Sequence, residues 1–335
     1  MIGEHTPRTH AKPCESRLCA SLYVCVTVKA GEAAHGGQGV TDDTGFIERE
    51  LRAADGIVLR YRDYGSRFST RPPVLCLPGL TRNAKDFHDL AMALSPDRRV
   101  LSLDARGRGR SDRDPTYANY TLIREVGDTL SLISQEFTRP CIVVGTSRGG
   151  LAAMILHGVK PGSIAGIVLN DIGPELEPAG LARIMGYLGI VPEPLATWDD
   201  AVAALKATNA EDFPDLTDAQ WRAWAERTFR DEGGVPVLDY DPRLRDAMLE
   251  AGSGAPDFWP QFRSLAETSV LLLRGEHSDL LSPETVQKMR RMKPDLRAVT
   301  VRGRGHVPFL DEPEARSAIL SFVAERDAAA GASSS

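Results

Sequence analysis

The sequence is poor in cysteine, with five in 335 residues, and their spacing excludes a disulfide framework. Cys14, Cys19 and Cys25 lie in the N-terminal part and lack the C-x-x-C spacing of a zinc or redox site. Cys76 and Cys141 lie in apolar runs that predict buried strands, so we expect both to be small core residues.

An excess of positive charge is also missing, because the formal net charge is −6. General nucleic-acid binding requires a basic face, so we expect no nucleic-acid partner. Arginine is dense only between Arg106 and Arg113, where Asp104, Asp112 and Asp114 alternate with it. This alternation predicts a solvated turn.

Metal and cofactor motifs are absent as well. The seven histidines form no H-E-x-x-H or paired-ligand motif, so no metal is implied. Gly107-Arg108-Gly109 lacks the third glycine of a dinucleotide fingerprint, and no helix follows it directly. We therefore expect neither a metal nor an organic cofactor.

The mostly apolar stretch at residues 18–28 is too short to span a membrane. It has the composition of a secretory-signal core, with residues 30–34 as a cleavage region, which would make residues 1–34 the signal peptide of an exported protein. Glu15 and the long polar lead favour the alternative, a disordered or dispensable tail over residues 1–45 of a cytoplasmic protein.

The most informative stretch is residues 141–158. Four apolar residues predict a buried strand, residues 151–157 predict a helix that stops at Gly158, and Gly145-Thr146-Ser147-Arg148-Gly149 lies between them. A strand that turns directly into a helix places the middle residue of G-x-S-x-G on a sharp bend. We expect the Ser147 hydroxyl to be exposed there, at a helix N-terminus that favours negative charge.

Strand and helix patterns alternate along most of the chain, which predicts a parallel sheet covered by helices on both faces. A hairpin at residues 46–53 and 57–64 forms its antiparallel start. The further strands are predicted at residues 73–77, 99–103, 141–144, 164–169, 270–273 and 298–301, and the helices outside residues 141–262 at 84–94, 120–137, 283–292 and 312–328.

The alternation is interrupted at residues 173–262, a stretch too long for an ordinary loop. It has helical patterns at residues 181–188, 198–207 and 218–229 and no convincing strand, which predicts a helical cap. The predicted domains are thus a core of residues 46–172 and 263–328, the cap, and a flexible tail at 329–335. Trp221 and Trp224 share a helix face in the cap and are candidate pocket residues.

A serine nucleophile needs a base, and the base needs an acid. Both should follow strands of the same sheet, because the carboxyl ends of parallel strands share one edge. His306 follows the last strand among glycines and is the candidate base. Asp279 follows the preceding strand and is the candidate acid, with Glu276 and then Asp171 as alternatives.

The oxyanion of an acyl-transfer reaction needs two N–H donors. We expect the backbone of Arg148, directly after Ser147, and that of Leu80, in the loop after residue 77. Gly79 would make room for substrate in that loop. The Arg148 side chain could bind a substrate carboxylate, but we favour a structural pairing with a nearby acid.

These motifs resemble the α/β-hydrolase fold superfamily. The resemblance covers about residues 46–326 and rests on Leu-Pro-Gly-Leu (77–80), Asp-Ala-Arg-Gly-Arg-Gly-Arg-Ser-Asp (104–112), the serine motif, Arg-Gly-Glu-His-Ser-Asp (274–279) and Gly-Arg-Gly-His (303–306). It implies an eight-stranded sheet with a helical cap and a Ser147–His306–Asp279 triad. The sequence departs from many relatives at Arg148, and one extra residue precedes Asp279.

The resemblance leaves three functions open for a small-molecule pocket. We favour a serine hydrolase that cleaves esters or lactones of small apolar acids through an acyl-enzyme. A C–C bond hydrolase of diketone-like ring-cleavage products would use the same triad. A receptor would keep the pocket without turnover.

Overall fold

The computed structural model describes residues 45–190, 195–252 and 256–332. Except for Gly45, the predicted N-terminal tail or signal, with its three cysteines, lies outside these residues. Cys76 and Cys141 are fully buried in strands, so their prediction as core residues is confirmed.

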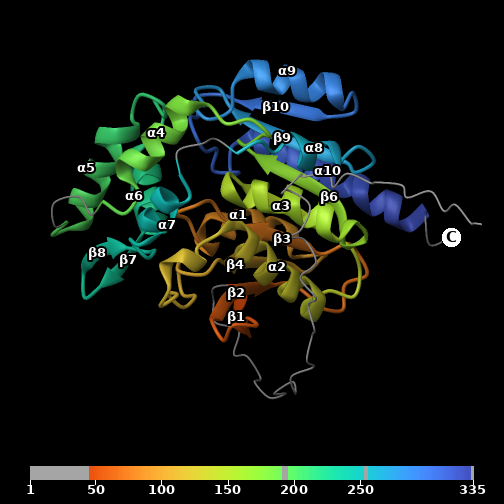
Figure 1. The fold of residues 1–335 in the computed structure, drawn as a ribbon, viewed down its shortest axis with the longest axis horizontal. Helices are drawn as coiled ribbons and strands as arrows, with labels where there is room; N and C mark the ends of the chain where they lie inside the picture. Colours follow the sequence, from red (N-terminus) through yellow and green to blue (C-terminus); the bar gives the residue numbers. More distant parts are fainter. Residues whose placement is uncertain (1–44, 191–194, 253–255, 333–335) are drawn as a thin grey trace, which may run out of the picture. The chain divides into compact units, whose positions relative to one another are not determined.

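The predicted eight-stranded, mostly parallel sheet is confirmed. Its strand order is β1-β2-β4-β3-β5-β6-β9-β10, and β2 alone runs against the others. Figure 1 shows this sheet from β1 at the bottom to β10 at the top. The strands are β1 (Phe46–Arg52), β2 (Val58–Tyr64), β3 (Val74–Leu77), β4 (Val100–Asp104), β5 (Cys141–Thr146), β6 (Ile164–Asn170), β9 (Val270–Gly275) and β10 (Arg297–Val301).

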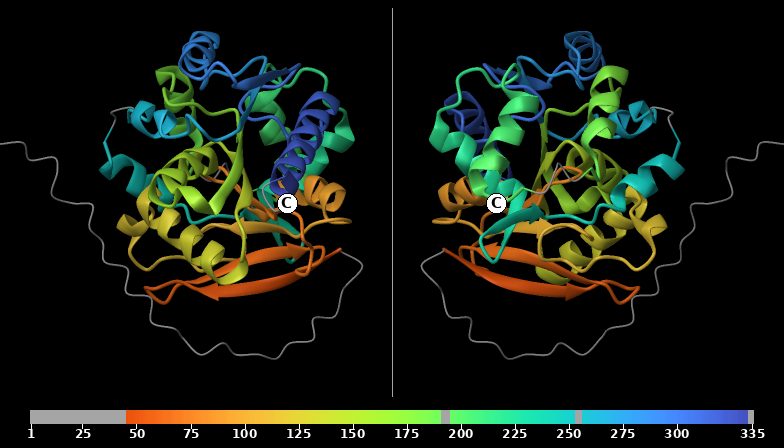
Figure 2. Two further views of the ribbon diagram at one scale, coloured as in Figure 1. Left: turned by 90° about the vertical axis from the view of Figure 1, so that its right-hand side faces the viewer. Right: turned by 90° about the vertical axis from the view of Figure 1, so that its left-hand side faces the viewer.

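Helices cover both faces of the sheet because its central strands are apolar on both faces. In β3, Leu75 and Leu77 belong to one hydrophobic cluster with α2, α3, α8 and α9, whereas Val74 and Cys76 belong to another with α1 and α10. Figure 2 shows the two layers from the side. These helices are α1 (His88–Leu94), α2 (Leu122–Glu136), α3 (Arg148–Val159), α8 (Trp259–Arg263), α9 (Pro283–Met292) and α10 (Pro313–Ala332).

Several helix ends differ from their predicted positions by one to four residues. α3 continues through Gly158 to Val159, and α10 continues past residue 328 to Ala332, into the predicted C-terminal tail. Among residues 45–190, 195–252 and 256–332, no helix combines the length and the apolar composition needed to cross a lipid bilayer.

Residues 173–262, which we call the cap segment, lie between β6 and β9, and most of this segment gathers at the left of Figure 1. The three predicted helices are present as α4 (Pro178–Tyr187), α5 (Trp198–Asn209) and α6 (Asp218–Thr228), followed by α7 (Leu244–Glu250). The expectation of no strand is wrong, because β7 (Phe229–Glu232) and β8 (Val235–Leu238) form an antiparallel hairpin. Gly233 and Gly234, both at positive φ, make its two-residue turn.

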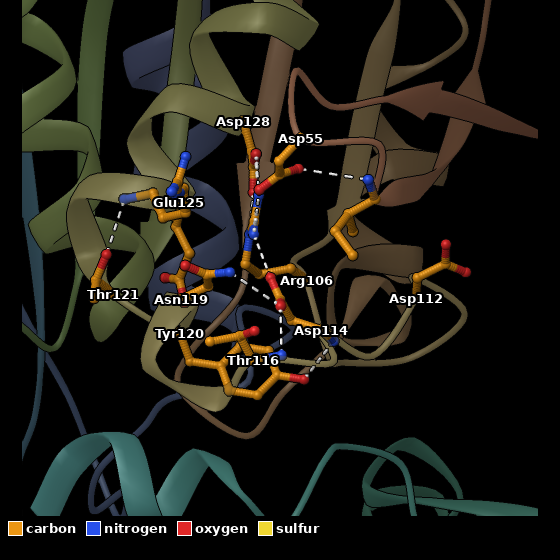
Figure 3. Close-up of polar contacts among 12 residues, drawn as sticks. Asp55, Arg106, Asp112, Asp114, Thr116, Asn119, Tyr120, Thr121, Glu125 and Asp128 are labelled. Carbon is orange, nitrogen blue, oxygen red and sulfur yellow. Dashed lines mark hydrogen bonds and ion pairs between the residues drawn. The ribbon is translucent and has the colours of Figure 1, made fainter. Parts of the chain in front are cut away.

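The arginine-rich turn after β4 is only partly solvated: Arg106 and Arg108 are buried, whereas Arg110 and Arg113 are exposed. Its prediction as a solvated turn is therefore wrong for the first two arginines. The Arg106 side chain is fully buried and forms ion pairs with Asp55, Asp114 and Asp128 at 2.7–3.0 Å (Figure 3). A buried guanidinium is tolerated only with such partners. Asp128 belongs to α2, so this network ties the turn to that helix.

Candidate active site

Ser147 lies on the sharp bend that its motif predicts. The residue lies between the end of β5 and the start of α3, and its φ is 50° and its ψ is −117°. A Cβ on Gly145 would lie 2.6 Å from the backbone of Gly149, and one on Gly149 would lie 2.2 Å from the Leu77 carbonyl oxygen. The bend therefore requires glycine at both flanking positions.

His306 reaches Ser147 from the loop that follows β10. Its Nε2 lies 2.9 Å from Ser147 Oγ, and its Nδ1 lies 2.7 Å from Asp171 Oδ2. The two ring nitrogens thus contact a hydroxyl on one side and a carboxylate on the other. This is the geometry in which a histidine can accept a serine proton while its tautomer is held.

The acid that contacts His306 is Asp171, not Asp279, which corrects the sequence prediction. Asp171 directly follows β6, has a positive φ of 54° and is completely buried. Its carboxylate also accepts hydrogen bonds from the Gly275 N–H at 2.8 Å and the Ser278 hydroxyl at 2.7 Å. These donors fix the carboxylate against His306.

Asp279 is engaged elsewhere. Its carboxylate forms a bidentate ion pair with Arg183 of α4, at 2.5 and 2.8 Å. Burial raises the pKa of Asp279, but the hydrogen bonds and charge of Arg183 outweigh it, so the pKa lies below its ordinary value. Glu276, the other alternative, accepts a hydrogen bond from the Gly303 N–H.

One feature of the sequence could have indicated Asp171. Ser278 stands one position before Asp279, and its hydroxyl donates a hydrogen bond to Asp171. The extra residue before Asp279 therefore places a hydrogen-bond donor, rather than a carboxylate, next to the histidine loop.

The two predicted oxyanion donors lie beside Ser147. Arg148 is the first residue of α3, so its N–H has no acceptor within the helix. Leu80 follows Gly79, and a Cβ on Gly79 would lie 3.7 Å from Ser147 Cβ. Gly79 and Leu80 both line the same cavity as Ser147.

Glu125 of α2 links the residues that carry these donors. It pairs with Arg108 at 2.8 Å and with Arg148 at 2.7 Å, which confirms the structural pairing expected for Arg148. Arg108 Nε in turn donates to the Leu80 carbonyl oxygen at 2.8 Å. Burial raises the pKa of Glu125, but the two guanidiniums outweigh it and lower the pKa overall. Two cations share one carboxylate, so this cluster keeps a net positive charge.

Ser147 and His306 open into a cavity of about 480 Å³, a size typical of small-molecule sites. The core contributes Gly79 and Leu80, and the cap segment contributes residues of α4, α5, α6 and the hairpin. Trp224 lines the cavity as predicted, whereas Trp221 does not and instead stacks on Trp224 at 5.2 Å between ring centroids. Much of the lining is aliphatic: Ile184, Ile190, Ala204, Leu205, Leu238, Val307 and Leu310.

Three arginines that no sequence motif marks also line the cavity: Arg82, Arg183 and Arg227. They come from the loop after β3 and from two cap helices, so no local motif connects them. Among the described residues, no group of three His, Cys, Asp or Glu side chains is arranged to hold a metal ion.

Comparison with known proteins agrees with this geometry. A family model described as the alpha/beta hydrolase family matches residues 74–318. The chain is 34% identical over 264 residues to a 3-hydroxybutyrate-oligomer hydrolase of Cupriavidus necator, covering 76% of this chain and 89% of that protein. It is 28% identical over 281 residues to a 2-(acetamidomethylene)succinate hydrolase of Mesorhizobium japonicum, covering 83% and 95%.

Among solved structures, an alpha/beta hydrolase from Novosphingobium aromaticivorans superposes with a TM-score of 0.79 at 41% identity, covering 84% of this chain and 99% of that one. The family model spans well over half of the chain, and the sheet, the serine bend and the histidine loop all agree with it. The protein belongs to the α/β-hydrolase family.

Proposed function

We propose that the protein is a serine hydrolase that cleaves small carboxylic esters or lactones through an acyl-enzyme on Ser147. The observation that carries this proposal is the chain of contacts from Ser147 Oγ through His306 to Asp171, at 2.9 and 2.7 Å. A continuous nucleophile–base–acid arrangement favours catalysis over a silent receptor.

In the proposed reaction, His306 Nε2 takes the Ser147 proton while Oγ attacks the ester carbonyl. Asp171 stabilises the imidazolium, and the N–H groups of Arg148 and Leu80 stabilise the oxyanion. His306 then gives the proton to the departing alcohol, whose C–O bond breaks. A water molecule, activated by the same histidine, hydrolyses the acyl-enzyme and releases the acid.

The relatives support an ester substrate. Units of 3-hydroxybutyrate are joined between a hydroxyl and a carboxyl group, so the oligomer that the Cupriavidus protein's name denotes is a chain of esters. The aliphatic cavity lining supports a small, largely apolar acid, because each buried methylene contributes about 0.8 kcal/mol to binding.

The test is hydrolysis of 4-nitrophenyl butyrate by the Ser147→Ala variant. Losing the nucleophile of a triad costs on the order of a millionfold in kcat. Ser131→Ala is the matched control, because Ser131 lies half-buried on α2, outside the cavity lining, and donates its hydroxyl to the Gly127 carbonyl oxygen. If folded Ser147→Ala protein keeps activity within tenfold of the wild type, the assignment is rejected.

A further inference from the structure

Carboxylates neutralise two of the three arginines that line the cavity. Arg82 pairs with Asp86, and its Nε donates to that carboxylate at 2.8 Å. Arg183 pairs with Asp279. Among the described residues, Arg227 has no carboxylate partner, and its Nε is buried without a hydrogen-bond partner. Arg227 is partly buried on the wall of this largely aliphatic cavity, and a buried guanidinium nitrogen without a partner is costly unless a ligand satisfies it.

The position of Arg227 is fixed by its surroundings. Its guanidinium lies over the ring of Phe309, 5.2 Å from the centroid. Its carbonyl oxygen accepts a hydrogen bond from Asn83 Nδ2 at 3.1 Å, and Lys85 Nζ binds the neighbouring carbonyls of Glu226 and Phe229. These bonds hold the backbone at the end of α6, and the Phe309 ring supports the guanidinium.

The other charged groups at the cavity do not cancel this charge. Among the residues that the structure describes, Asp86 is the only acid in the lining, and it is paired with Arg82, while Asp279 is paired with Arg183. Arg227 lies in the last turn of α6, where a cation also complements the helix dipole. That role needs only a charge near the helix end and does not require a position in the lining of the cavity.

We propose that Arg227 binds a carboxylate of the substrate, so that the preferred substrates are short esters carrying a free carboxylate away from the scissile bond. The inference rests on the proposed ester hydrolysis and narrows its substrate class to half-esters of dicarboxylic acids and short esters of hydroxy acids. Guanidinium and carboxylate match in geometry and form paired charge-assisted hydrogen bonds. Hydrolysis of a hydroxy-acid dimer adds one water across the ester bond and yields two hydroxy acids.

Two pairs of substrates that differ by a single methyl group test this proposal. The first pair is 4-nitrophenyl hydrogen glutarate and its methyl ester, which places the charge on the acyl side. The second is the linear dimer of 3-hydroxybutyrate and its methyl ester, which places the charge on the alcohol side. We expect the wild type to prefer the charged member of at least one pair by roughly tenfold or more in kcat/KM.

Arg227→Gln should abolish this preference while keeping kcat/KM for the neutral members within about threefold of the wild-type value. Arg227→Lys should retain part of the preference. Arg222→Gln is the matched control, because Arg222 lies on the same helix, outside the cavity lining, and pairs with Glu226. The proposal is overturned if the wild type shows no preference, or if Arg227→Gln lowers kcat/KM equally for the charged and the neutral substrates. If Arg227→Gln does not fold, the ratios of kcat/KM between charged and neutral substrates, measured for the wild type and for Arg227→Lys, test the proposal.

Calorimetric titration with glutarate separates this proposal from the proposed reaction. Binding to the wild type that weakens at least tenfold in Arg227→Gln supports the carboxylate site even if no ester is turned over. Ester turnover without any charge preference and without glutarate binding leaves the hydrolase intact and rejects the carboxylate site.

Discussion

Two groups of arginines lie next to the candidate active site, and carboxylates neutralise them differently. In the turn after β4, Arg106 has three carboxylate partners, and Arg108 shares Glu125 with Arg148. In the cavity, Arg82 and Arg183 each have one carboxylate, and Arg227 has none among the described residues.

The difference separates charges that hold the protein together from a charge that is free for a ligand. Carboxylates of α2 and of the β1–β2 turn pair with the turn arginines, and Arg108 in turn donates to the Leu80 carbonyl oxygen, so this network holds the loop that carries Leu80. In the cavity, Arg227 lacks a carboxylate partner among the described residues. Position and partner, rather than residue type, therefore decide what an arginine does here.

The largest expected effect distinguishes the two aspartates at the edge of the sheet. Asp171→Asn should lower kcat for 4-nitrophenyl butyrate about ten-thousandfold, because the acid orients His306 and stabilises its protonated form. Asp279→Asn should keep kcat within tenfold, because Asp279 serves Arg183 instead. Steady-state kinetics of both variants provide the test, and a larger loss in Asp279→Asn would contradict this assignment of roles.

The Asp279 variant also sharpens the comparison of arginines. Freeing Arg183 gives the cavity a second guanidinium without a carboxylate, which should raise the preference for the charged member of each substrate pair. The pKa of Asp279 is depressed, so the stability from its ion pair is complete above the ordinary pKa of aspartate and is lost as the pH falls through the lower, folded value. Comparisons near pH 7 therefore report the intact pair.

The next effect concerns the turn. Glu125→Gln removes the one carboxylate that Arg108 and Arg148 share, and breaking a buried pair in this way costs about 3–5 kcal/mol. Glu136→Gln on the same helix is the control, because its partner Arg99 keeps Asp63. Urea denaturation measures the free energy of unfolding of both variants. Equal, small losses in the two variants would show that the buried pairs do not hold the turn in place.

The smallest expected effect is the gain in kcat/KM for each methylene that the aliphatic lining of the cavity buries. Across 4-nitrophenyl esters from acetate to palmitate, kcat/KM should rise about fourfold for each added methylene, corresponding to about 0.8 kcal/mol, until the cavity is full. It should then stop rising, because methylenes that extend beyond the cavity gain no burial. A flat profile, or a maximum at palmitate, would indicate an open cleft.

Most of the fold could be predicted from the sequence because local patterns determine it. Apolar runs alternate with helical patterns, and Ser147 and His306 are both marked by neighbouring glycines. The β7–β8 hairpin was missed because Arg230, Asp231 and Glu232 hide the strand pattern, although Gly233-Gly234 is a recognised hairpin turn.

The acid and the buried arginines depend on tertiary contacts that no local pattern contains. Asp171 and Asp279 follow neighbouring strands, β6 and β9, so spacing alone cannot decide which of them reaches His306. The partners of Arg106 and Arg108 on α2 lie far along the chain from the turn. An alternation of charges therefore resembles a solvated surface in sequence, although the folded chain buries Arg106 and Arg108.

Labelling with a fluorophosphonate tests the central claim most directly, because this reagent reacts with a serine only when a base activates it. The account predicts one adduct per chain, located on Ser147, with a rate that falls sharply in Asp171→Asn and little in Asp279→Asn. An ester-cleaving, folded protein that stays unlabelled, or that carries the adduct on another residue, would contradict it.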